Sequence, residues 1–141
     1  CLIAECGSDM SQFPTAGHLA SWAGMCPGNN KSAGRTGAGT TRRGPIWLRQ
    51  HLIEVAHATA RTKGNHLAAR HRRIRSRRGS KRAAVATGHA ILRTVWHMLD
   101  RREPFNNLGD DYYRRDNDVE ARRLIKRLKL LGVEVTINDA A

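Results

Sequence analysis

The spacing of apolar residues along the chain predicts a small, mainly α domain. Apolar positions recur three or four residues apart, which is the period of a helix with one buried face. Five segments show this period, at about residues 16–24, 45–62, 66–78, 81–101 and 117–131. We therefore expect about five helices, with a long glycine-rich loop between the first two.

Capping residues support these bounds. A side-chain oxygen before a helix accepts a hydrogen bond from a free backbone N–H, and glycine ends helices readily. The sequence offers Thr15, Asn65, Ser80 and Asp116 as N-caps, Pro45 for a first turn, and Gly24, Gly64 and Gly79 as terminators. Residues 104–116 are expected to form a loop, and residues 133–137 alternate like one short C-terminal strand without an obvious partner.

The glycine-rich segment, residues 26–44, holds a candidate site. Its length is typical of loops with a function, although it has no Walker A pattern. It combines the hydroxyl of Ser32 with four cations, Lys31, Arg35, Arg42 and Arg43. Cations of this kind offset the charge of a phosphodiester under attack by a hydroxyl. From composition alone, most serines in such a segment are ordinary loop residues.

Charge is the strongest compositional signal. The net charge is +13, and residues 1–99 carry all of it, because residues 100–141 hold nine basic and nine acidic residues. Residues 55–99 contain no acid, and one strip within them is dense in cations: Arg70, Arg72, Arg73, Arg75, Arg77, Arg78, Lys81 and Arg82. A solvated basic face or a disordered arm is the plain alternative, but the strip favours binding to nucleic-acid phosphates.

Other chemistries have weaker signals. Three cysteines without C-x-x-C spacing and seven scattered histidines indicate no metal site, and the absence of 18 consecutive apolar residues excludes a transmembrane helix. The acids from Asp110 to Glu120 are explained by helix capping, and Trp22, Trp47 and Trp96 are expected in the core. Tyr112 and Tyr113 fit a tyrosine recombinase only weakly. A membrane-surface role lacks an apolar face beside the basic residues.

Several blocks together resemble a known family. Residues 13–34 end in Cys-Pro-Gly-Asn-Asn-Lys-Ser-Ala-Gly, residues 58–64 read Ala-Thr-Ala-Arg-Thr-Lys-Gly, and residues 79–83 read Gly-Ser-Lys-Arg-Ala. Further blocks lie at residues 71–74, 88–92, 102–105, 108–112 and 131–136. In this order they resemble the C-terminal transposase domain of the IS-one-ten group of bacterial insertion-sequence transposases, over nearly the entire chain.

The resemblance implies a function and an architecture. Ser32 matches the family's serine that attacks DNA and forms a covalent phosphoserine link, and a structured guide RNA is implied as a second partner. The resemblance also implies a RuvC-like domain with an acidic DEDD quartet that binds Mg²⁺. That domain is absent from these 141 residues, which do not begin with Met, so we expect a fragment of a cytoplasmic, homo-oligomeric bacterial protein. The alternative is a non-catalytic, basic nucleic-acid-binding remnant of a decayed transposase.

Overall fold

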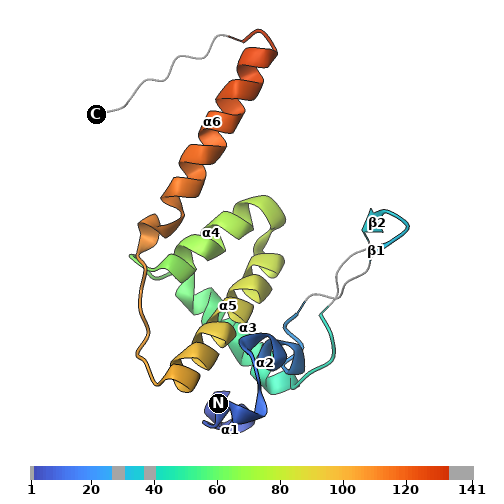
Figure 1. The fold of residues 1–141 in the computed structure, drawn as a ribbon, viewed down its shortest axis with the longest axis vertical. Helices are drawn as coiled ribbons and strands as arrows, with labels where there is room; N and C mark the ends of the chain where they lie inside the picture. Colours follow the sequence, from blue (N-terminus) through green and yellow to red (C-terminus); the bar gives the residue numbers. More distant parts are fainter. Residues whose placement is uncertain (1, 27–30, 37–40, 134–141) are drawn as a thin grey trace.

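Six α-helices and one short hairpin make up the described part of the chain (Figure 1). The computed structural model describes residues 2–26, 31–36 and 41–133, and only the backbone of residues 31, 32, 35, 36, 114–118 and 120. The elements are α1 (Leu2–Cys6), η1 (Met10–Gln12, a 3-10 turn), α2 (Ala16–Trp22), β1 (Lys31–Ser32), β2 (Arg35–Thr36), α3 (Ile46–Thr59), α4 (His66–Arg78), α5 (Ser80–Arg101), η2 (Asp110–Tyr113, a 3-10 turn) and α6 (Arg114–Leu130). The prediction of a mainly helical domain is confirmed.

Two of the four predicted N-caps are confirmed and two are wrong. Thr15 accepts a hydrogen bond from the His18 N–H, and Asn65 Oδ1 accepts one from the Leu67 N–H at 2.8 Å. Ser80 is instead the first residue of α5, whose N-cap is Gly79. Helix α6 begins at Arg114, so position 116 lies inside the helix rather than before it. Local capping signals therefore located these helices but missed the start of α5 by one residue and that of α6 by three.

The core forms where α5 crosses the other helices. Leu19 of α2, Leu48 of α3 and Leu92 of α5 are fully buried, and Trp96 Nε1 of α5 donates a hydrogen bond to the Phe13 carbonyl at 3.0 Å. Helices α3 and α5 approach closely at Gly88, where a Cβ would lie 3.1 Å from a backbone oxygen of α3. These contacts make α5 the central element of the domain.

Helix α4 is attached to α5 through a buried polar pair. His71 Nδ1 lies 3.3 Å from Thr87 Oγ1, and both residues are buried. Burial lowers the pKa of His71, and the nearby His57 and Arg75 lower it further, so the imidazole is neutral at pH 7. This contact fixes which face of α4 is buried and leaves the opposite face to solvent.

Helix α6 extends away from the other helices (Figure 1). Among the described residues its main contacts are with η2, and the apolar Leu124, Leu128 and Leu131 on it are exposed. The apolar stripe predicted for this helix therefore has no covering element in the described part of the chain. Apart from Val133, the strand expected at residues 133–137 lies outside the described residues.

Candidate nucleic-acid interface

The segment that carries Ser32 forms a β-hairpin, not the plain loop expected from its glycines. Strands β1 and β2 pair antiparallel, with Ser32 opposite Arg35 and Lys31 opposite Thr36. The two residues between the strands, Ala33 and Gly34, have φ angles of 47° and 77°. Positive φ at both central positions is the mark of a type I′ turn, which matches the twist of paired strands. Ser32 is therefore the last strand residue before a tight turn, and Figure 1 shows the hairpin standing clear of the helices.

The glycine-rich segment is anchored to the helices by a close backbone contact that we call the neck. It is formed by Ala23 and Gly24, after α2, and by residues 42–44, before α3. A Cβ on Gly44 would lie 2.6 Å from the Ala23 carbonyl carbon, and a Cβ on Gly24 would lie 2.6 Å from the Arg42 oxygen. Gly24 also has a φ of 67°, which favours glycine. Glycine at both positions therefore lets the two ends of the segment meet.

Replacement of Gly44 with alanine is expected to destabilise the domain by about 1–3 kcal/mol. The added methyl would also lie 2.7 Å from the Ala23 oxygen and the Gly24 nitrogen, and these backbone atoms move only if the neck opens. Thermal unfolding measures the effect. Gly17→Ala is the matched control, because its added Cβ meets only Thr15 Oγ1, at 3.4 Å, and alanine favours the helix. Equal melting temperatures for Gly44→Ala and the wild type would contradict the close backbone contact that we describe at the neck.

The structure places only some of the predicted phosphate-binding residues. Arg42 and Arg43 are exposed at the neck, and the Arg42 carbonyl accepts a hydrogen bond from Arg49 Nη1 at 3.4 Å. The side chains of Lys31, Ser32 and Arg35 lie outside the described residues. The prediction that Arg42 and Arg43 accompany Ser32 at a phosphate therefore stays a prediction.

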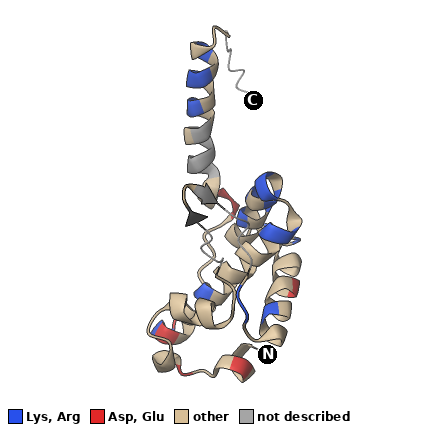
Figure 2. Cartoon of the chain, turned by 90° about the vertical axis from the view of Figure 1, so that its right-hand side faces the viewer, with Lys and Arg blue, Asp and Glu red and all other residues tan. Residues whose placement is uncertain are grey.

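The predicted basic strip spans the turn from α4 into α5, and we call its eight residues the basic corner (Figure 2). Six of its side chains are exposed and two are half-buried; the half-buried ones are Arg70 and Arg73, and the exposed ones are Arg72, Arg75, Arg77, Arg78, Lys81 and Arg82. Figure 2 shows Lys and Arg gathered at this turn. The buried pair of His71 and Thr87 directs one side of α4 to α5 and leaves Arg73 and Arg77 on the opposite side. Arg75 and Arg78, four and seven residues after His71, are on its own side and are exposed where α4 ends.

The local charges at the basic corner favour an anion. Arg75, Arg77 and Arg78 occupy the last turn of α4, where cations interact favourably with the helix dipole. Lys81 and Arg82 occupy the first turn of α5, where the dipole disfavours cations, and that turn holds no acid and receives no side-chain cap. Like charges at this density repel one another unless a counter-charge is close. An external polyanion would supply that counter-charge.

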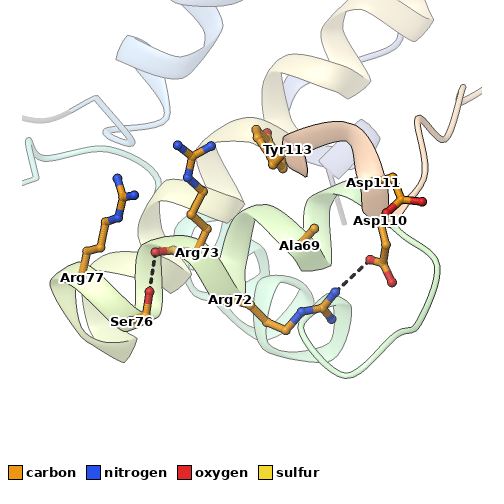
Figure 3. A pocket seen from close by; sticks show the side chains of 8 residues that line it. All are labelled: Ala69, Arg72, Arg73, Ser76, Arg77, Asp110, Asp111 and Tyr113. Carbon is orange, nitrogen blue, oxygen red and sulfur yellow. Dashed lines mark hydrogen bonds and ion pairs between the residues drawn. The ribbon is translucent and has the colours of Figure 1, made fainter. Parts of the chain in front are cut away.

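A cleft of about 570 Å³ lies between α4 and η2 (Figure 3). Three arginines of the basic corner line it, Arg72, Arg73 and Arg77, together with Ala69, Ser76, Asp110, Asp111 and Tyr113. Arg72 Nη2 donates to Asp110 Oδ1 at 2.8 Å, and the Arg73 guanidinium lies 5.5 Å from the centre of the Tyr113 ring. The cleft thus presents guanidinium groups beside an aromatic ring and two carboxylates.

Two side chains of the segment after α5 hold η2 against the start of α4. Asn107 Oδ1 accepts a hydrogen bond from the His66 N–H at 3.2 Å, and Asn107 Nδ2 donates one to the Gly64 carbonyl at 2.7 Å. Asp110 Oδ2 accepts one from the Gly64 N–H at 3.0 Å. That backbone bond, and then Arg72, lower the pKa of Asp110, so the carboxylate is ionised at neutral pH. The sequence predicted that helix capping explains Asp110. That prediction is wrong, because the Asp110 carboxylate bonds to Gly64, in the turn before α4.

The described residues support neither a metal site nor a membrane span. Among the side chains that the structure describes, which leave out those of residues 114–118 and 120, no group of three His, Cys, Asp or Glu is placed to share a metal ion. The helices in residues 2–26, 31–36 and 41–133 are also too short or too polar to cross a membrane.

Comparison with known proteins identifies the family. The model of the transposase IS116/IS110/IS902 family matches residues 1–72, from α1 through the Ser32 hairpin and into α4. The chain belongs to this family of insertion-sequence transposases. It is also similar to a probable family 20 transposase of Pseudomonas aeruginosa, with 32% identity over 103 residues, which cover 70% of this chain and 30% of the relative. The chain thus spans under a third of the length of that transposase. No solved structure matches the chain.

The family match supports the resemblance read from the motifs, and the structure adds contacts that the sequence did not predict. Gly24 and Gly44 join the neck, Asn107 and Asp110 position η2, and Tyr113 contacts an arginine of the basic corner. Only the two glycines had a sequence signal for the contact they make, since both flank the glycine-rich segment of this chain. The other contacts join residues about 40 positions apart, and the spacing of residues carries no information on such contacts.

Proposed function

We propose that this chain is the DNA-binding, serine-bearing C-terminal part of a transposase. The observation that carries the proposal is the basic corner, with six exposed cations on two adjoining helices and no acid between Glu54 and Asp100. Family membership makes DNA the polyanion to be expected there. The phosphate backbone supplies most of the affinity of such a surface, and it does so without reading sequence.

The chemical step that we propose uses Ser32. Its oxygen attacks the phosphorus of a DNA phosphodiester, an Oγ–P bond forms, and one P–O bond to a deoxyribose breaks. The serine proton leaves, and the released deoxyribose oxygen takes up a proton. Arg35, Arg42 and Arg43 offset the charge that develops on the phosphate oxygens. Support comes from the tight turn that follows Ser32 and from the exposed arginines at the neck.

The remaining parts of the assembly are proposals about the longer protein. The resemblance implies an acidic DEDD domain that binds Mg²⁺, and this chain covers only 30% of its relative, so such a domain would belong to the part of a full-length transposase not spanned here. The phosphates of a structured guide RNA would bind the cations of the same basic corner. We also propose that the full-length protein is a homo-oligomer.

Salt dependence of DNA binding tests the proposed interface. Each phosphate neutralised by a cation releases counterions, so log affinity falls with log salt by about 0.9 per contact on B-DNA. Four contacts from the cations outside the cleft, and up to eight from the whole basic corner, predict a slope of about −4 to −7. Fluorescence anisotropy with a labelled 20-base-pair duplex, at several salt concentrations, gives this slope. A slope near zero, or no binding by the folded chain, would exclude the proposed role of the basic corner.

A further inference from the structure

Trp47 lies on the surface, although its position in the apolar pattern predicts a core residue. Its side chain is 68% exposed, more than any other described aromatic side chain. Leu48, Leu52 and Ala56 form the buried face of α3, and Trp47 precedes that face by about 100° around the helix. Ile46 beside it is also exposed. Most of the surface of this indole ring therefore faces solvent and not the core.

The surroundings of Trp47 are cationic and lie at the base of the Ser32 hairpin. Trp47 follows Gly44 of the neck by three residues, and the exposed Arg42 and Arg43 come directly before that glycine. Arg49, two residues after Trp47, donates to the Arg42 carbonyl and so lies beside the same segment. The first turn of α3 holds no acid. Trp22, which is 40% exposed, precedes the other side of the neck.

From this juxtaposition we propose that Trp47 stacks on an unpaired base of the DNA strand that approaches Ser32. The proposal rests on the proposed function, because it takes the polyanion at the neck to be DNA. Aromatic rings stack on any base, and neighbouring arginines hold the backbone of the strand. Bases inside an intact duplex have no free face, so the occupant is a base in a gap or a single strand.

The charge around Trp47 favours this occupant over a protein partner. Arg42 and Arg43 are exposed and precede Trp47 by five and four residues, Arg49 is bonded to the same segment, and the first turn of α3 holds no acid, so the segment around the ring suits phosphate groups. Single-strand binding sites combine the same two elements, an aromatic platform and a cationic groove. Tyr112 and Tyr113 are poorer candidates, because Tyr112 packs edge-on against His66 and Tyr113 already contacts Arg73.

The test compares two DNA probes, a 20-base-pair duplex and the same duplex with a central gap of four unpaired thymidines. Loss of one base stack is worth about five- to a hundredfold in affinity. We expect Trp47→Ala to weaken binding to the gapped probe by this factor and to leave duplex binding unchanged, because the basic corner is intact. Trp47→Phe should retain most of the gapped-probe affinity. Val55→Ala is the matched control, since Val55 is exposed on the same helix two turns away.

A second measurement locates the contact directly. Iododeoxyuridine in the gap is irradiated with the wild-type chain, and mass spectrometry of the crosslinked peptide should identify Trp47. Melting temperatures of the variants should equal that of the wild type, because the replaced ring is exposed.

The outcomes separate this proposal from the proposed function. If the wild type binds both probes and Trp47→Ala binds the gapped probe equally well, the stacking role is wrong while DNA binding stands. The same conclusion holds if Trp47→Ala weakens only the assembly of a full-length transposase, which would indicate a protein partner. Equal losses on both probes would also overturn it. A folded wild-type chain that binds neither probe would contradict the proposed function itself.

Discussion

Neutralisation of four cations at the basic corner is expected to lower the affinity for duplex DNA by about a thousandfold at 0.15 M salt. The variant carries Arg75→Gln, Arg78→Gln, Lys81→Gln and Arg82→Gln, all at exposed positions outside the cleft. Each phosphate contact contributes about 1 kcal/mol through counterion release at this salt concentration, and the slope of log affinity against log salt should become less negative by about 3.6.

A second group of four arginines provides the control for net charge. Arg101 and Arg102 are exposed at the C-terminal end of α5, far along the helix from Lys81 and Arg82, and Arg122 and Arg123 are exposed on α6. Their replacement with glutamine removes the same number of charges. We expect this variant to lose about tenfold or less, because long-range attraction between exposed charges is screened at this ionic strength. Equal losses in the two variants would show that overall charge, and not the basic corner, holds the DNA.

Stability should change in the opposite direction to binding. The four replaced cations lie on one turn and the adjoining helix ends, with Lys81 and Arg82 at the end of α5 that disfavours them. The variant loses the favourable dipole interaction of Arg75 and Arg78 with α4, but it is relieved of the unfavourable one of Lys81 and Arg82 and of the repulsion among all four cations. The melting temperature of this variant should therefore equal or exceed that of the wild type. A gain in stability with a loss of binding is the signature of residues retained for a ligand.

Replacement of Ser32 with alanine is expected to abolish the covalent protein–DNA adduct. The experiment uses a full-length transposase of the family that carries the residues of this chain, incubated with DNA and resolved on a denaturing gel. Loss of a covalent nucleophile lowers the rate by more than about a thousandfold, so no adduct band should remain. DNA affinity should stay within about twofold, because the phosphate contacts of the basic corner do not involve this hydroxyl.

Ser21→Ala is the control for the loss of a hydroxyl, since Ser21 is exposed on α2. It should form the adduct at the wild-type rate. An adduct formed equally well by Ser32→Ala would assign the nucleophile to another residue. The absence of an adduct from the wild-type transposase, with DNA binding retained, would favour the non-catalytic remnant that the sequence left as an alternative.

Several features of this domain followed from the sequence alone. Helix bounds depend on local interactions. Thr15, Asn65 and Gly79 occupy helix ends, as their residue types predict. The excess of cations between Glu54 and Asp100 is a property of composition, and the family blocks around Ser32 gave a resemblance that the family match supports. Local signals were weakest at the hairpin, because Ala33 takes a positive φ that alanine rarely adopts and its turn lacks the common Asn-Gly pair.

Other features were decided only by the tertiary structure. Apolar residues of α3 extend over more of the helix surface than one neighbour covers, so the pattern did not reveal that Leu48 and Leu52 face α5 while Trp47 and Val55 face solvent. The neck and the cleft join segments far apart in sequence, through Gly24 with residues 42–44 and through Asn107 with Gly64. The physical reason is general: spacing fixes which residues share a face, whereas burial of that face depends on which element packs against it.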